Sequence, residues 1–188
     1  CQLLPNEPEP MGLLALMLFC EARSTARLDE QGRYIALDQQ DTTLWNMDFV
    51  NQAESLLLKA AQFGVMGPYQ LEAAIQSFHS QKCMGFDAPS SGLVALYDNL
   101  VALQPTLGAQ VSRVCAIAAD SGAANGLDAL AQLDTHLVAQ YQPYWAVKAH
   151  LSALLERTME AKAAYTHAIG LSQSDSVRQY LTSKLLKL

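Results

Sequence analysis

The chain has 188 residues, of which 51% are hydrophobic and 16% are charged, and its formal net charge is −6. This length allows one sizeable core or two small ones, and the high apolar content favours a packed chain over a disordered one. A domain that binds nucleic acid through phosphates is usually basic, so we expect no direct nucleic-acid contact from this acidic chain.

The cysteines and the first apolar run bear on the cellular compartment. The four cysteines, Cys1, Cys20, Cys83 and Cys115, follow no spacing typical of a zinc site or a disulfide framework, so we expect buried thiols in a reducing compartment. The apolar run 11–20 is too short to span a bilayer and lacks the basic leader of a signal peptide. We therefore expect a cytoplasmic chain without membrane contact. Because the chain begins with Cys and not Met, we also expect a fragment or a processed chain.

The first predicted helix covers about 11–24. Prolines and acidic residues at 7–10 suit its first turn. The helix is apolar nearly all round, so we expect it to be buried on several sides, as the centre of the N-terminal half. Turn residues at 29–32 then begin a loop that extends to residue 43, with 34–37 as a short candidate for extended structure.

A second helix is predicted over 43–63, where Gly64 ends it. Gly67-Pro68 begins the next helix, which ends before a loop at 81–90. Beyond this loop, apolar stripes at helical spacing alternate with breaks that contain Gly or Pro. The stripes that predict further helices start at Leu93, Val111, Ala123, Val147, Ala161 and Val177. No convincing strand ladder appears, so we predict an all-α fold of consecutive antiparallel helix pairs.

A helical pattern recurs with a spacing near 34 residues. Small, aromatic and small residues stand at Ala161, Tyr165 and Ala168; related frames occur at Leu93, Tyr97 and Leu100 and, more weakly, at Gly126, Leu130 and Leu133. This period is typical of tetratricopeptide-type helix pairs, which stack because no single pair can bury its apolar face alone. We predict an N-terminal helical subdomain at 1–66, followed at 67–188 by a short tetratricopeptide-like superhelix. Such stacks usually bind proteins or peptides, so we expect no enzyme activity.

Three stretches combine into a more specific pattern. They are Glu7-Pro8-Glu9-Pro10-Met11-Gly12-Leu13-Leu14-Ala15-Leu16-Met17-Leu18 with Ala22-Arg23 and Ala26-Arg27, Gln40-Asp41 followed by Trp45, and Gly67-Pro68-Tyr69-Gln70-Leu71-Glu72-Ala73-Ala74-Ile75 with His79. Together with Ala95-Leu96-Tyr97-Asp98 and the repeat, they resemble the C-terminal extension of extracytoplasmic-function-type RNA polymerase sigma factors with a tetratricopeptide-like tail. The likeness covers essentially the whole chain. It departs from the pattern of many relatives at Cys20-Glu21 and at Thr42.

The resemblance implies a regulatory, protein-interaction domain that controls transcription initiation. Two DNA- and polymerase-binding sigma domains would precede Cys1 in the full-length protein. The implied partners are these N-terminal sigma domains, which are absent from this chain, and the RNA polymerase core or a cytoplasmic regulator. The tail would regulate the sigma factor in place of a separate membrane anti-sigma partner.

The charged candidates for a binding site are Arg23, Arg27 and Asp41. Because the two arginines are four residues apart, we predict that they project from one helical face, where they are candidates for a fork that binds a carboxylate or phosphate. The interpretation that we favour is that they pair internally with Glu21, Asp29 or Asp41 and pin the loop 28–43 to the central helix.

Trp45, Tyr69 and Gln70 are candidates for a ligand pocket, although aromatic residues at such places more often pack in a core. This pocket would support an alternative function, a small-molecule-sensing domain that binds an anionic ligand near Arg23, Arg27, Trp45 and Tyr69. His79 and Cys83 are four residues apart and form at most half of a metal site, since zinc requires three or four protein ligands. We predict no metal, no cofactor and no catalytic motif.

Overall fold

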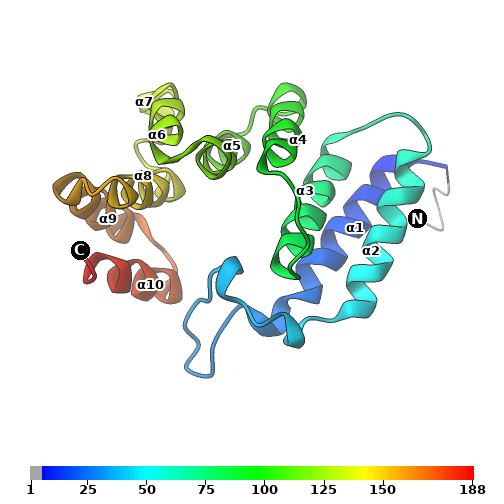
Figure 1. The fold of residues 1–188 in the computed structure, drawn as a ribbon, viewed down its shortest axis with the longest axis horizontal. Coiled ribbons are helices and arrows are strands. Elements are labelled where there is room, and N and C mark those ends of the chain that lie inside the picture. Colours follow the sequence, from blue (N-terminus) through cyan, green and yellow to red (C-terminus); the bar gives the residue numbers. More distant parts are fainter. Residues whose placement is uncertain (1–5) are drawn as a thin grey trace. The chain divides into compact units, whose positions relative to one another are not determined.

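The computed structural model describes residues 6–188, and over this range the chain is all-α, as predicted, with no β-strand. Short 3₁₀ turns, η1 (Ser24–Ala26), η2 (Leu37–Gln39) and η3 (Thr42–Leu44), lie between the first two helices. The α-helices are α1 (Pro8–Ala22), α2 (Met47–Ala61), α3 (Pro68–Cys83), α4 (Ser90–Leu103), α5 (Leu107–Ser121), α6 (Ala123–Ala131), α7 (Thr135–Val138), α8 (Gln142–Leu154), α9 (Thr158–Leu171) and α10 (Asp175–Leu185) (Figure 1).

The chain divides into two compact units. The first comprises Cys1–Asp29 and Ile35–Gln104, and the second comprises Glu30–Tyr34 and Pro105–Leu188. We predicted a boundary after residue 66, but the first unit continues through α3 and α4. The reason is that α3 packs against α1 as well as pairing with α4.

In the first unit, α1 lies between α2 and α3 and contacts both (Figure 1). The backbone N–H of Asn46, which caps the start of α2, donates to the carbonyl of Ala22 at the end of α1 over 2.9 Å, so α1 and α2 run antiparallel. The starts of α1 and α3 meet instead, so these two helices run parallel. The core between the three helices consists of Ala15, Phe19, Ala22, Val50, Ala53 and Ala73.

A stripe of α1 is not covered by either neighbour. Leu13 is 37% exposed, Leu14 36% and Met17 59%, although we expected this apolar helix to be buried on several sides. The expectation was wrong for this stripe because two neighbouring helices cover only part of the circumference of a third. Apolar residues therefore remain at the surface over successive turns of α1.

The second unit contains two helix pairs, α5 with α6 and α8 with α9, and α10 packs against α9. A glycine allows α6 to approach both α5 and α8, because a Cβ at Gly126 would lie only 2.7 Å from the Cβ of Ala118 and 3.0 Å from a methyl carbon of Leu151. The predicted helix pairs are therefore confirmed, including the pair of α3 and α4 in the first unit.

The repeated frame marks the second helix of each pair. Its residues lie in α4, α6 and α9, apart from Leu133, which follows the end of α6, and most of them are buried: Leu93, Leu100, Gly126, Leu130, Ala161, Tyr165 and Ala168. Small or apolar residues recur there because these are the positions at which paired helices make their closest contacts.

Two further expectations concern the thiols and the membrane. We expected buried thiols; Cys20 and Cys83 are half-buried, and Cys115 is exposed as a residue although burial of its thiol raises the pKa to about 11, while Cys1 lies outside the described residues. Among residues 6–188, no helix is both long enough and apolar enough to cross a membrane.

Candidate functional site

Arg23 turns inward at the point where α1 ends. It is the C-cap residue of the helix and only 8% of its surface is exposed. One terminal nitrogen donates to the Oε1 atom of Gln76 over 2.6 Å, and Nε donates to the carbonyl of Phe19 over 3.4 Å. Its guanidinium carbon also lies 5.9 Å from the ring centroid of Trp45. An amide, a carbonyl and an aromatic face thus surround this buried positive charge.

Arg27 lies outside this arrangement. The helix ends at Ala22 and the 3₁₀ turn η1 follows, so the two arginines do not project from one helical face as predicted. Arg27 is exposed, and its terminal nitrogen folds back to donate to the carbonyl of Cys20 over 2.9 Å. It satisfies a carbonyl near the C-terminus of α1, where positive charge suits the helix dipole.

Asp41 caps the short turn η3. Its Oδ1 atom accepts hydrogen bonds from the hydroxyl of Thr43 over 2.7 Å and from the backbone N–H of Thr43 over 2.9 Å. The first of these bonds, aided by the second, lowers the pKa of Asp41. This carboxylate is exposed, and both of its hydrogen bonds come from Thr43, two positions away. Asp41 therefore acts as a local cap.

Other contacts attach the turns η2 and η3, at the end of the loop 28–43, to the residues around them. The hydroxyl of Thr25 donates to the carbonyl of Leu44 over 2.8 Å, and the thiol of Cys83 lies 3.6 Å from the carbonyl of Leu37. Both bonds end on backbone carbonyls of the 3₁₀ turns. The turns η2 and η3 are therefore anchored through their backbone, and η3 holds its own cap.

Trp45 is a buried residue, with 4% of its surface exposed. Its indole Nε1 atom is buried and, within residues 6–188, has no hydrogen-bond partner, and the Oε1 atom of Gln40 is in the same condition. A donor and an acceptor are thus both unsatisfied in the segment 40–45. Buried polar atoms without partners are uncommon and often mark the place of a water molecule or another small polar group.

His79 belongs to the same end of the unit. It is half-buried on α3, and burial lowers the pKa of its imidazole, followed by the charges of Arg23 and Lys82. The neutral imidazole is favoured beside these cations. We call Arg23, Trp45, Gln76 and His79 the Arg23 cluster. Residues 6–188 contain no group of three or more His, Cys, Asp or Glu side chains arranged to hold a metal ion.

Tyr69 and Gln70 lie at the opposite end of α1. Gln70 is 4% exposed and contacts Glu9 near the start of this helix, whereas Tyr69 is 43% exposed. The start and the end of a 15-residue helix are about 20 Å apart. The predicted pocket of Trp45, Tyr69 and Gln70 is therefore divided between two places, because Trp45 lies near the end of α1 and Tyr69 and Gln70 lie near its start.

Glu9 is the residue that sequence reasoning missed. Its carboxylate accepts hydrogen bonds from the backbone N–H groups of Tyr69 and Gln70, over 3.0 and 3.1 Å, and from the Gln70 side-chain amide over 3.2 Å. Gly67, the N-cap residue of α3, has no side chain to cap that helix. The missing cap was the available signal, because free N–H groups at a helix start need an acceptor from elsewhere.

Comparison with known proteins gives two matches. Residues 1–61 match a family of unknown function, DUF6596. An uncharacterised protein of Rhizobium meliloti (strain 1021) is 32% identical over 184 residues, which is 98% of this chain and 43% of the relative. The chain thus spans less than half the length of that relative. No solved structure matches the chain.

Proposed function

We propose that this chain is the regulatory, protein-interaction domain of an alternative RNA polymerase sigma factor, and that it has no enzyme activity of its own. The motifs at 7–18, 40–45 and 67–75, with the repeat, resemble the tail of such factors. The structural observation that carries the proposal is the succession of helix pairs with small residues at their closest contacts, an architecture commonly used to bind polypeptides.

The length of the relative is compatible with this arrangement. More than half of the Rhizobium meliloti protein lies outside the matched region, which leaves room for further domains in that protein. In the proposed full-length protein, sigma domains would occupy such a region, and the present chain would contact them, the polymerase core or a cytoplasmic regulator.

The proposed mechanism is a shift between two docked arrangements. Apolar contacts and a few charge pairs would favour either a competent or a blocked arrangement of the sigma domains. A difference of a few kcal/mol between the two is enough to change the active fraction many-fold.

Transcription by the full-length protein, with and without residues 1–188, tests the proposal. We expect removal of the domain to change initiation at the target promoter while binding of the remaining protein to the polymerase core stays measurable. Equal transcript levels from the two proteins, at matched concentrations of folded protein, would contradict a regulatory role.

A second candidate function, the sensing of a small anionic molecule, is favoured by the unpaired indole Nε1 atom of Trp45, a member of the Arg23 cluster, and by the unpaired Oε1 atom of Gln40 five positions before it. The chain has two tryptophans, so Trp145→Phe leaves Trp45 as the sole indole reporter. Its emission would be followed during titration with inorganic phosphate and with citrate. Saturable changes that Arg23→Lys weakens would support this function, and an unchanged emission spectrum would count against it.

A further inference from the structure

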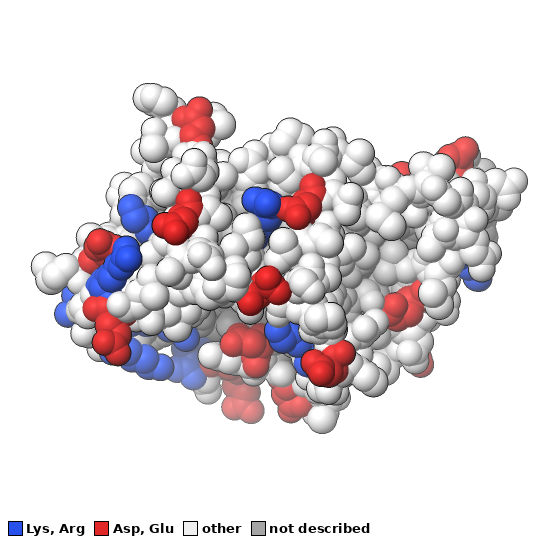
Figure 2. All heavy atoms as spheres, turned by 45° about the horizontal axis from the view of Figure 1, so that its top comes forward, with Lys and Arg blue, Asp and Glu red and all other residues white. Residues whose placement is uncertain are grey.

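The two compact units differ in charge. The first unit has eleven acidic and four basic residues, a formal charge of −7, whereas the second has seven acidic and eight basic residues, a formal charge of +1. On the face drawn in Figure 2, Lys and Arg side chains are most frequent at the left, on the side of α8 to α10. The acidity of the whole chain therefore resides in its first unit.

The uncovered stripe of α1 lies in this acidic unit. We call the exposed side chains of Leu13, Leu14 and Met17 the α1 face. Glu7 and Glu21 flank it, and both are exposed. Glu21 comes seven positions, or two helical turns, after Leu14, so its carboxylate lies on about the same side of the helix as the apolar residues, while Glu7 is the N-cap residue that precedes the first turn. Pro8–Ala22 contains no Lys or Arg, although the exposed guanidinium of Arg27 binds the carbonyl of Cys20, the residue before Glu21.

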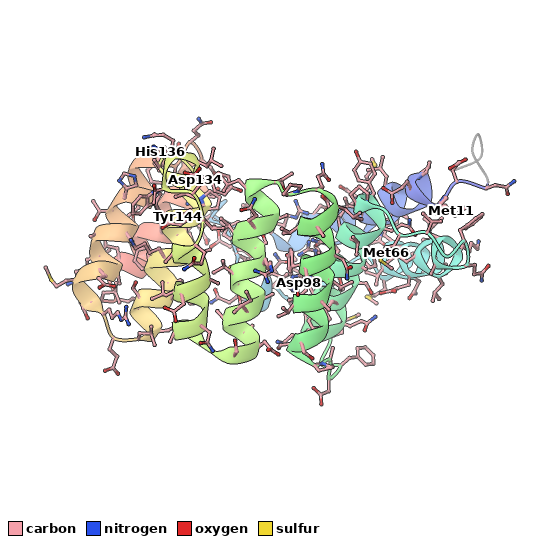
Figure 3. The ribbon with its side chains drawn as sticks, turned by 90° about the horizontal axis from the view of Figure 1, so that it is seen from above. Met11, Met66, Asp98, Asp134, His136 and Tyr144 are labelled. Carbon is pink, nitrogen blue, oxygen red and sulfur yellow. The ribbon has the colours of Figure 1, made fainter. Side chains whose placement is uncertain are left out.

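Glu9, the third acidic residue of this region, does not contribute to the charge around the α1 face in the same way. The carboxylate of Glu9 is engaged by the start of α3, through Tyr69 and Gln70. In Figure 3 Met11, which follows Glu9 in α1, and Met66, which precedes Tyr69 in the α2–α3 connection, both lie on the right-hand side of the view. The α1 face thus belongs to a helix whose position is set by its contacts with α2 and α3.

Charge decides which occupant fits the α1 face. A second copy that docked through the same face would bring another unit of charge −7 against the first, and an anionic membrane or a nucleic acid would be repelled in the same way. A polypeptide with apolar and basic side chains on one face can contact the apolar residues of the α1 face and is not repelled by the acidic unit. From residue 13 to residue 17 the exposed apolar side chains span about 6 Å, roughly one helical turn, and Glu21 follows about one turn later.

We propose that the α1 face docks a basic amphipathic helix, with Leu13, Leu14 and Met17 contacting its apolar residues and Glu7 and Glu21 pairing with its Lys or Arg residues. This inference rests on the proposed function and refines it, since it assigns the contact surface and the chemistry of the partner. Helix-on-helix docking of this kind buries apolar area for affinity, and the flanking charges set the orientation and the association rate.

The binding experiment uses the chain of 188 residues and fluorescent peptides of about 20 residues, long enough to be helical. One peptide is an amphipathic Leu-Lys helix, and its counterpart has Glu at every Lys position. Fluorescence anisotropy should detect saturable binding of the Leu-Lys peptide, weakened by salt, and no binding of the Leu-Glu peptide. Equal binding of both peptides would contradict the proposal.

Matched variants then locate the site. The triple variant Leu13→Gln, Leu14→Gln, Met17→Gln should raise the Kd for the Leu-Lys peptide by about tenfold or more. A control triple variant, Leu103→Gln, Leu154→Gln, Met159→Gln, removes two leucines and one methionine that are at least as exposed, and its Kd should stay within about twofold of wild type. Glu21→Lys should weaken binding more than Asp128→Lys, which makes the same charge change on α6. Equal losses from the test and control variants would overturn the assignment.

Two further measurements test the occupants that charge disfavours. Sedimentation of the wild-type chain and flotation with anionic phospholipid vesicles should show neither self-association nor vesicle binding through the α1 face. A dimer or vesicle complex that the α1-face triple variant abolishes would replace the proposed partner.

The same variants in the full-length protein separate this inference from the proposed function. We expect the α1-face triple variant to change transcription in the same direction as deletion of residues 1–188. If deletion changes transcription but the triple variant leaves both transcription and peptide binding unaltered, the docking surface is wrong and the regulatory function stands. If peptide binding follows the prediction but deletion has no effect on transcription, the proposed function fails instead.

Discussion

Glu9 and Gln70 are joined by two hydrogen bonds, although sixty-one positions separate them in the sequence. The backbone N–H of Gln70 donates to Oε1 of Glu9 over 3.1 Å, and its side-chain amide donates to the same oxygen over 3.2 Å. With the additional bond from the backbone N–H of Tyr69, this carboxylate performs for α3 the role that an N-cap side chain usually performs. The contact explains why α1 and α3 start at the same end of the first unit.

Removal of this carboxylate should destabilise the protein. We expect Glu9→Ala to lower the free energy of unfolding by about 2 kcal/mol, because hydrogen bonds to a charged acceptor are lost and the Gln70 amide loses a partner. Glu7→Ala is the matched control, since Glu7 is exposed and makes no capping bond, and it should change stability by less than about 0.5 kcal/mol. Urea denaturation followed by circular dichroism measures both, and similar losses would contradict the capping role.

A pair of glycine substitutions tests the close approach of α1 and α3. A Cβ at Gly12 would lie 2.7 Å from the backbone nitrogen of Gln70, so Gly12→Ala should force the helices apart and cost about 1–3 kcal/mol. Gly170 lies in α9 with no atom near its would-be Cβ, so Gly170→Ala should stabilise the protein by up to about 1 kcal/mol. Thermal unfolding should therefore move in opposite directions for the two variants, and a common direction would refute the steric explanation.

The two arginines should respond differently to truncation. Arg23→Ala removes a buried side chain and leaves the Gln76 acceptor without its donor, so we expect a loss of about 2–3 kcal/mol. Arg27→Ala removes one exposed hydrogen bond and should cost about 0.5 kcal/mol. Chemical denaturation of both variants checks the difference. If Arg23→Ala unfolds as wild type does, its role is in binding and not in the fold.

Glu72 gives a pH dependence with a definite sign. Burial, and then the charge of Glu9, raise the pKa of Glu72 above its ordinary value of 4.5. The folded chain therefore binds this proton more tightly than the unfolded chain, and ionisation of Glu72 costs stability as the pH rises above 4.5. We expect Glu72→Gln to be more stable than wild type at pH 7 and equal to it below about pH 4.5. Urea titrations across this range measure the difference, with Asp128→Asn as an exposed control, and a difference that is constant with pH would exclude the linkage.

The link between α8 and α9 contains a strained residue. Glu156 has a backbone φ of 58°, in the left-handed region that glycine adopts without strain, while the N–H of Arg157 donates to the carbonyl of Ser152 over 2.9 Å. Glu156→Gly should raise the free energy of unfolding by about 1 kcal/mol. Lys162→Gly, inside α9, should lower it by a similar amount, about 1 kcal/mol. Calorimetric melting distinguishes the two, and destabilisation by Glu156→Gly would show that the left-handed turn is not strained.

Much of the fold could be predicted because its signals are local. Apolar residues at helical spacing, with Gly64 and Pro68 at the breaks, are sufficient to place the helices, since periodicity and backbone preferences act within a few residues. The recurrence of Ala161, Tyr165 and Ala168 at a spacing near 34 residues likewise identifies the second helix of each pair. These features depend on neighbours along the chain, and they are visible without coordinates.

The arrangement of the site and its surroundings could be determined only from the tertiary structure. Whether Arg23 turns toward Gln76 or toward solvent, whether Trp45 and Tyr69 lie together, and which part of α1 stays uncovered all depend on which helix faces meet. An apolar helix satisfies its local pattern equally well with either face exposed. The sequence by itself determined the helices and their pairing, whereas the packing of α1 against α2 and α3 decided the site, because contacts between residues fifty or sixty positions apart leave no periodic trace in the chain.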